Sequence, residues 1–189
     1  MIKQQFEEAQ RILAEFISNP ENLQKIQAAG SMMVDAVRDG NKIIACGNGG
    51  SMCDAMHFAE ELSGRYRNDR PAIAAVSISD PSHITCVGND YGFEFVFSRY
   101  LDALGKPGDV LLAISTSGNS ANILHAVETA RRRNIHVVAL TGKNGGKLAE
   151  LADVEIRAPY SEFADRAQEI HIKVIHSLIG YIEAEMFQQ

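Results

Sequence analysis

The fold of this chain is decided by two short polar segments, Cys46-Gly47-Asn48-Gly49-Gly50-Ser51 and Ser115-Thr116-Ser117-Gly118-Asn119-Ser120. Each follows an apolar run typical of a buried strand, 42–46 in one case and 110–114 in the other, and each precedes a segment with helical periodicity. Open α/β folds bind their ligands at the carboxyl ends of parallel strands. Two strand–loop–helix units therefore predict a parallel sheet with a ligand site at that edge.

Strands and helices alternate through the middle of the chain. Besides the two strands above, strands are predicted at 72–78, 136–140 and 154–156, and helices at 51–63, 120–133 and near 147–151. The less regular segment 80–104 is expected to hold two short helices on either side of residues 88–92. Helices of this length between strands imply right-handed crossovers and a mostly parallel sheet. We expect an α/β fold in a single domain that covers residues 1–189.

Amphipathic helices are predicted at both ends of the chain. The first 40 residues form two helices broken near Asn19-Pro20, and the last helix runs from Glu162 to about Met186. Apolar residues recur three and four positions apart in the first and last helices, at Ile2, Phe6, Ala9, Leu13 and Phe16 and at Ile172, Ile175, Ile179, Ile182 and Met186. Because stripes of this spacing pack helix on helix, they favour a homo-oligomer with helical interfaces.

Charge and cysteine count narrow the class of protein. The formal net charge of −6 argues against nucleic acid as a partner. The three cysteines lack metal-ligand spacing, which indicates reduced thiols, and Cys46 and Cys53 are expected to pack in the core. The first residues lack a secretory apolar segment, and no apolar run reaches the roughly 18 residues of a membrane span. We expect a cytoplasmic protein with no membrane partner.

The two polar segments have the composition of a phosphate site. Small Gly, Ser, Thr and Asn side chains let backbone N–H groups approach an anion, and the helix N-termini that follow add partial positive charge. Hydroxyls donate to and accept from phosphate oxygens. Neither segment is a Walker A or dinucleotide motif. The segments predict a phosphorylated small molecule as ligand; the alternative is that they are ordinary turns joining strand to helix.

One face of the helix after the first segment carries titratable side chains. Asp54, His57, Glu61 and Arg65 follow one another at spacings of three and four, which places them on one stripe. His57 and Glu61 could share a metal ion or a substrate. A solvated salt-bridge ladder is the alternative.

The last helix offers Gln168 and His176, eight residues and roughly 12 Å apart along the axis. One ion or substrate between two long side chains could meet both. The alternative for His176 is a hydrogen-bonded core histidine, which is the commoner role of a lone histidine in a stretch such as 173–178.

These segments together resemble the phosphosugar-binding SIS domain of the sedoheptulose 7-phosphate isomerase family. The resemblance rests on blocks in the same order over nearly the whole chain: Gly47-Asn48-Gly49-Gly50-Ser51, His57-Phe58-Ala59-Glu60-Glu61-Leu62, Val87-Gly88-Asn89-Asp90, Ser115-Thr116-Ser117-Gly118-Asn119-Ser120, Leu140-Thr141-Gly142-Lys143 and Gln168-Glu169-Ile170-His171-Ile172-Lys173-Val174-Ile175-His176. It implies a flavodoxin-like or Rossmann-like five-stranded parallel sheet flanked by helices, with an N-terminal helical hairpin and a long C-terminal helix. It also implies a homotetramer with active sites at subunit contacts.

The resemblance further implies a reaction and roles for named residues. The reaction converts D-sedoheptulose 7-phosphate to D-glycero-D-manno-heptose 7-phosphate, the first step of ADP-heptose synthesis for lipopolysaccharide. The implied roles are phosphate binding by Ser51, Ser115, Thr116, Ser117 and Ser120; further substrate binding by Asn48, Gly49, Gly50, Glu61, Asn89, Asp90 and Gln168; acid–base catalysis by Glu61 and His176; and one zinc ion per subunit on His57, Glu61, Gln168 and His176.

The chemistry fits those residue types. Moving a proton between C1 and C2 of a sugar through an enediol needs a carboxylate base and a group that exchanges protons near neutral pH, and zinc can polarise the carbonyl. Two other functions stay open: a non-catalytic SIS adaptor that binds the replication initiator, and a phosphosugar-sensing regulatory module. Such an adaptor need not keep an acid–base pair, and such a module is normally fused to a DNA-binding segment.

Overall fold

The computed structural model describes residues 1–187 and contains one five-stranded sheet whose strands are all parallel, in the order β2-β1-β3-β4-β5. The strands are β1 (Ile43–Gly47), β2 (Ala75–Ser77), β3 (Val110–Ser115), β4 (His136–Thr141) and β5 (Val154–Arg157). The α/β prediction is confirmed, and four strands lie within one residue of their predicted bounds. The fifth, β2, is shorter than the predicted 72–78, because the Ile73 N–H donates to the Leu62 carbonyl (3.0 Å) instead of pairing in the sheet.

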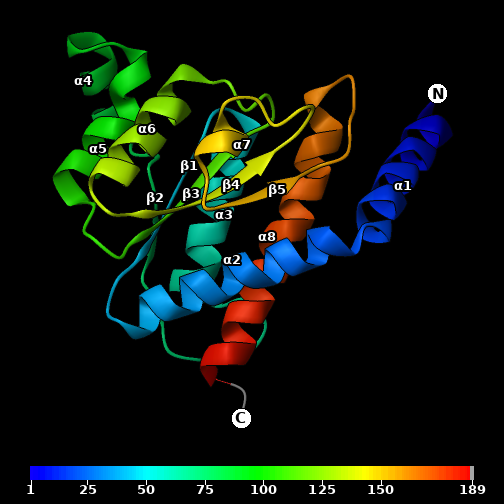
Figure 1. The fold of residues 1–189 in the computed structure, drawn as a ribbon, viewed down its shortest axis with the longest axis horizontal. Helices are drawn as coiled ribbons and strands as arrows, with labels where there is room; N and C mark the ends of the chain where they lie inside the picture. The colour runs from blue at the N-terminus through cyan, green and yellow to red at the C-terminus, as the bar shows by residue number, and fades with distance from the viewer. Residues whose placement is uncertain (188–189) are drawn as a thin grey trace.

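Helices cover both faces of the sheet (Figure 1). One face packs against α2 (Pro20–Arg38), α3 (Gly50–Ser63) and α8 (Ala164–Phe187). The other packs against α4 (Pro81–Asp90), α5 (Val96–Leu104), α6 (Ala121–Arg132) and α7 (Leu148–Leu151). Alternate residues of β1 serve the two cores: Ile43 and Ala45 face the α2–α3–α8 layer, while Ile44 and Cys46 face the other. A strand buried on both faces reads as a continuous apolar run.

The predicted helix breaks are present and have local causes. Asn19 separates α1 (Ile2–Ser18) from α2 and its side chain accepts the Glu21 N–H at 3.1 Å, while Pro20 occupies the first turn. The predicted pair of short helices, α4 and α5, is separated by a short 3-10 helix (Phe93–Phe95) that Gly92 introduces at φ +107°. That backbone angle favours glycine.

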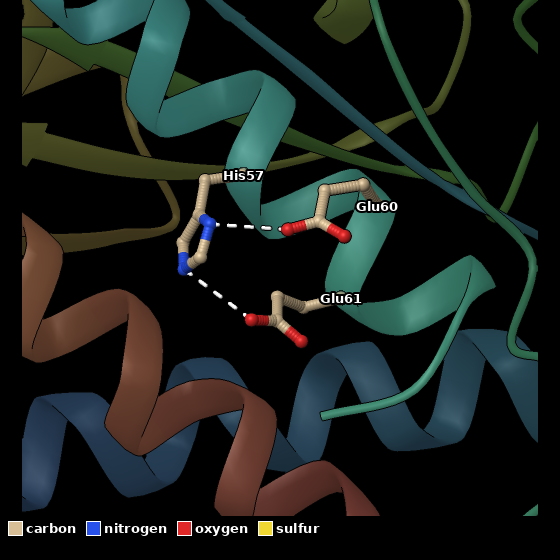
Figure 2. Close-up of side chains that lie close together, drawn as sticks. All are labelled: His57, Glu60 and Glu61. Atoms are coloured by element: carbon tan, nitrogen blue, oxygen red, sulfur yellow. Dashed lines mark ion pairs between the residues drawn. The ribbon is translucent and has the colours of Figure 1, made fainter. Parts of the chain in front are cut away.

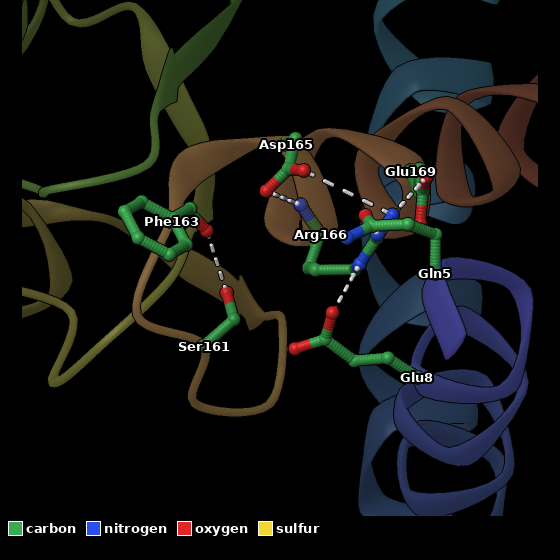
Figure 3. Close-up of polar contacts among 7 residues, drawn as sticks. All are labelled: Gln5, Glu8, Ser161, Phe163, Asp165, Arg166 and Glu169. Atoms are coloured by element: carbon green, nitrogen blue, oxygen red, sulfur yellow. Dashed lines mark hydrogen bonds and ion pairs between the residues drawn. The ribbon is translucent and has the colours of Figure 1, made fainter. Parts of the chain in front are cut away.

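Helix α1 extends from the body of the molecule beside the start of α8 (Figure 1). Arg166 of α8, whose side chain is 6% exposed, ties the two helices together by donating to Gln5 and Glu8 of α1 and to Glu169 of its own helix (Figure 3). The apolar stripe of α1 is only half covered: Phe16 is buried, whereas Ile2 and Phe6 are 72% and 74% exposed.

Helix α8 is apolar on two flanks and packs against α1, α2 and α3. His171 pins it to the sheet, because its Nε2 lies 2.8 Å from the Thr141 carbonyl at the end of β4. Burial lowers the pKa of His171 to about 4, so the ring is neutral at neutral pH and Nε2 is the donor. This contact fixes the position of α8 along its axis relative to the end of β4.

The cysteine prediction holds for one residue and is wrong for the other. Cys46 is buried in β1, and burial raises the pKa of its thiol to about 12. Cys53 is exposed on the outer side of α3, because Ala55, Phe58 and Leu62 already supply the buried face of that helix. Over residues 1–187, no helix is both long enough and apolar enough to cross a membrane.

Candidate active site

The two polar loops meet where the strand order reverses. The first loop (residues 46–51) follows β1, the second loop (residues 115–120) follows β3, and these strands are neighbours in the sheet. The side-chain amides of Asn48 and Asn122 exchange two hydrogen bonds of 2.9 and 2.8 Å, which link the first loop to the start of α6. In open α/β sheets this switch point is the ligand-binding edge.

Glycines allow the first loop to turn tightly into α3. A side chain on Gly47 would collide with the backbone of Ser51, and Gly49 has φ +55°. The Ser51 N–H donates to the Asn48 carbonyl at 3.0 Å. Gly50 and Ser51 thus begin α3, so the N-terminus of that helix lies at the first loop.

Hydroxyls line the second loop. Ser115 Oγ lies 3.1 Å from Ser120 Oγ, and Ser117 Oγ accepts the Asn119 N–H at 3.2 Å. Thr116 is half-buried between them. Ser120 precedes α6 without capping it through its side chain. Hydroxyls and the helix N-terminus therefore stand together at the sheet edge, as the sequence predicts.

A second group of polar side chains lies where α3 contacts α8. We call His57, Glu61 and His176 the α3–α8 cluster. His57 Nε2 lies 2.9 Å from His176 Nε2 and 3.6 Å from Glu61 Oε1, while His57 Nδ1 lies 3.1 Å from Glu60 Oε1. Figure 2 shows His57, Glu60 and Glu61 converging from successive turns of α3. Residues that the sequence separates by more than a hundred positions are thus in contact.

Comparison with known proteins places this arrangement in a family. Residues 4–142 match the family model described as the SIS domain. A phosphoheptose isomerase of Tolumonas auensis is 62% identical over 98% of this chain and 97% of its own length. The structure of the phosphoheptose isomerase of Neisseria gonorrhoeae superposes with a TM-score of 0.90 at 42% identity, over 97% of both chains. The chain belongs to the phosphoheptose isomerase family of SIS-domain enzymes.

A further solved member agrees with this assignment. The phosphoheptose isomerase of Francisella tularensis has a TM-score of 0.89 at 37% identity, and covers 96% of this chain and 95% of its own. The chain is therefore an isomerase with the SIS fold.

In this family member His176 is partly enclosed. The ring of Tyr66 stacks on it at 5.8 Å between centroids. Burial, and then the neighbouring His57, lower the pKa of His176, with Glu61 acting in the opposite direction. The 2.9 Å contact between the two Nε2 atoms requires one ring to donate and the other to accept. The accepting imidazole of the pair is therefore neutral, and its Nε2 lone pair makes this contact.

The α3–α8 cluster has the donor set of a zinc site. Among the described residues, ligand atoms of His57, Glu60 and Glu61 lie within 4.8 Å of one another, and His176 adds a second imidazole nitrogen beside His57. Imidazole nitrogen and carboxylate oxygen are the donors that catalytic zinc takes. Glu60 contacts the other nitrogen of His57, as carboxylates do behind zinc-binding histidines. The residues present fit the ion.

Two predicted substrate residues, Asn89 and Asp90, lie apart from the cluster within this chain. Gln168 of α8 lies against the first loop, because a Cβ on Gly50 would come 2.7 Å from its Nε2. Asn89 and Asp90 are exposed at the end of α4 and bond to each other at 2.7 Å. Within residues 1–187, no hydrogen bond joins that pair to either loop or to the α3–α8 cluster.

The structure modifies the predicted α3 stripe. Asp54 begins it with Oδ2 buried and unpaired, and burial raises the pKa of Asp54 to about 6 against the opposing effect of His57. Arg65 does not belong to the stripe, because α3 ends at Ser63 with Gly64 as its cap. The sequence analysis assigns no role to Glu60, although its position three residues after His57 predicts that the two side chains lie on one face of the helix. Arg70, in the loop after α3, had no such signal.

Proposed function

We propose that the chain interconverts D-sedoheptulose 7-phosphate and D-glycero-D-manno-heptose 7-phosphate as an aldose–ketose isomerase. The observation that carries this proposal is the meeting of His176 on α8 with His57 and Glu61 on α3, in a chain whose β1 and β3 end in polar loops. Relatives named phosphoheptose isomerases support the same substrate class.

The two loops bind the substrate in this proposal. Hydroxyls of Ser51, Ser115, Thr116, Ser117 and Ser120, with the N-termini of α3 and α6, hold the phosphate. Asn48, Gly49 and Gly50 contact the sugar from the first loop, Gln168 contacts it from α8, and Asn89 and Asp90 contribute from α4. Hydrogen bonds to a phosphate dianion are charge-assisted and supply most of the affinity.

Glu61 and His176 carry out the proton transfers. In the direction from ketose to aldose, the Glu61 carboxylate removes a proton from C1, which forms an enediol, and returns a proton to C2. His176 moves a proton from O1 to O2, so that the carbonyl passes from C2 to C1. Its lowered pKa favours a neutral ring that can accept before it donates.

His57, Glu61, Gln168 and His176 would hold one zinc ion, with Glu60 orienting His57. The ion would supply Lewis-acid polarisation of the sugar carbonyl when bound. Measured zinc content should fall in His57→Ala and in His176→Ala alike. Unchanged zinc in both variants would remove this part of the proposal.

The enzyme is proposed to work in the cytoplasm as a homotetramer with active sites at subunit contacts. The exposed end of the α1 stripe and the distance of Asn89 and Asp90 from the α3–α8 cluster support a site completed between subunits. Light scattering should give a mass about four times that of the 20.7 kDa chain. A monomer at micromolar concentration would contradict the shared site.

Incubation of the pure protein with sedoheptulose 7-phosphate tests the reaction. The heptose aldose should accumulate to an equilibrium, and this product supplies ADP-heptose for lipopolysaccharide. Binding of the sugar phosphate without turnover would instead favour the non-catalytic SIS adaptor that binds the replication initiator.

A further inference from the structure

A buried arginine outside the proposed catalytic set links the two helices of the α3–α8 cluster. Arg70 lies in the loop that follows α3, and its side chain is only 5% exposed. Its Nη1 donates to the Leu62 carbonyl at 2.7 Å and to the Gly64 carbonyl at 3.0 Å, and its Nη2 donates to the Glu61 carbonyl at 2.7 Å. Its Nε donates to Glu183 Oε1 of α8 at 2.8 Å.

The contacts on the α3 side close the end of a helix. The last carbonyls of an α-helix have no partner within the helix, and a cation there also complements the helix dipole. Arg70 satisfies two of them, Glu61 and Leu62. Because one of these carbonyls belongs to Glu61 itself, the arginine holds the backbone from which the proposed base projects.

The contact on the α8 side lies on the same face as His176. Glu183 follows His176 by seven residues, which is close to two full turns of helix and roughly 10 Å along the axis. The Glu183 side chain is 10% exposed. Arg70–Glu183 is thus a second polar link between α3 and α8, two turns beyond the link between His57 and His176.

We propose that Arg70 is a positioning residue that holds Glu61 and His176 at their working separation, with Glu183 as its anchor on α8. The inference rests on the proposed function, because it assigns Arg70 to that acid–base pair. Arginine is required because its planar fork reaches several carbonyls and a carboxylate together, which a lysine ammonium does not. Arg70 touches no part of either polar loop among its hydrogen bonds, so substrate affinity should survive its loss.

The test compares Arg70→Met with Arg133→Met. Arg133 also donates to a carbonyl at the end of a helix, Gly105 after α5 at 2.9 Å, but on the opposite face of the sheet. Leu101→Ala, a buried core position on α5, controls for loss of stability alone. The kcat and KM of each variant are measured per folded molecule, well below its melting temperature.

Arg70→Met should lose on the order of 10–100-fold in kcat with KM within about twofold of wild type, since small displacements of a catalytic group have effects of this size. Arg133→Met and Leu101→Ala should keep the wild-type kcat. Unchanged kcat in Arg70→Met, or an equal loss in the controls, would overturn the positioning role.

Two milder variants keep the test decisive if Arg70→Met does not fold. Arg70→Lys retains the charge but not the fork, so its kcat should fall between wild type and Arg70→Met. Glu183→Gln retains the acceptor oxygen and should lose less than Glu183→Ala. Wild-type kcat in both Arg70→Lys and Glu183→Ala would overturn the inference.

Amide hydrogen exchange separates this inference from the proposed reaction, because it needs no substrate. The Gly64 N–H, which donates to the Glu60 carbonyl at 2.7 Å, should exchange faster in Arg70→Met than in Arg133→Met. Inactive wild-type protein would overturn the proposed reaction alone. Active wild type with unaltered exchange and kcat in Arg70→Met would overturn the positioning role alone.

Discussion

The second loop and the α3–α8 cluster are built in opposite ways. In the loop, the serine hydroxyls contact near neighbours, Ser115 with Ser120 and Ser117 with Asn119, while the N–H groups of Lys147 and Leu148 add two longer-range contacts to the loop. In the cluster, the hydrogen bond between His57 and His176 spans 119 positions. Local backbone geometry brings the hydroxyls of the loop together, whereas the cluster exists only because α8 packs against α3. Binding and chemistry thus depend on different parts of the fold.

Loss of either member of the acid–base pair should give the largest effect. Glu61→Gln keeps the shape of the side chain but cannot accept a proton at neutral pH, and His176→Gln removes the exchangeable ring nitrogen. Each should lower kcat by about 10²–10⁴-fold, the usual contribution of general acid–base catalysis, with little change in KM. Steady-state kinetics measures both. Near-normal kcat in Glu61→Gln would return the chain to the adaptor hypothesis.

Changes in the second loop should weaken substrate binding and leave turnover nearly unchanged. Ser115→Ala and Ser117→Ala each remove a charge-assisted hydrogen bond to phosphate, worth on the order of 1.5–3 kcal/mol. KM should therefore rise strongly while kcat per folded molecule changes little. If the double variant keeps the wild-type KM, the phosphate binds elsewhere.

Acid should loosen α8 through His171. The pKa of its buried ring is about 4 in the folded protein, against about 6.5 in an unfolded chain. Between these values the unfolded state binds more protons, so stability is complete above about pH 6.5 and falls as pH drops toward 4. Each pKa unit is worth about 1.4 kcal/mol, so the loss is roughly 3 kcal/mol. Urea unfolding across this range measures it.

His171→Gln is the matched variant for that measurement, because a glutamine amide can still donate to the Thr141 carbonyl but does not titrate. Its unfolding free energy should depend less on pH between 4 and 6.5 than that of wild type. An identical slope in the two proteins would show that His171 titrates normally.

The contrast between local and distant contacts also explains what the sequence could predict. The strands and the loops after β1 and β3 follow from apolar runs and small polar residues, and four of the five strands lie within one residue of their predicted bounds. The side on which Cys53 lies depends on how α3 rolls against the core, and the sequence prediction was wrong there. The position of Arg70 is set by a loop that folds back onto the helix before it. No periodic pattern in the sequence predicts that contact.

The separation of Asn89 and Asp90 from the cluster has a related cause. The family resemblance groups them with the sugar-binding residues, yet α4 lies on the opposite face of the sheet from α3 and α8. A sequence pattern contains no information about which copy of a chain supplies a residue. Within one chain, the sheet lies between Asn89 and Asp90 on α4 and the α3–α8 cluster.

The double variant Glu61→Gln/His176→Gln tests most directly whether the contact of α3 with α8 creates one catalytic unit. Residues that act as a unit are strongly non-additive. We predict that kcat of the double variant falls little below that of the single variant with the lower kcat. Losses that multiply, so that the double variant shows the product of the two single effects, would contradict the account.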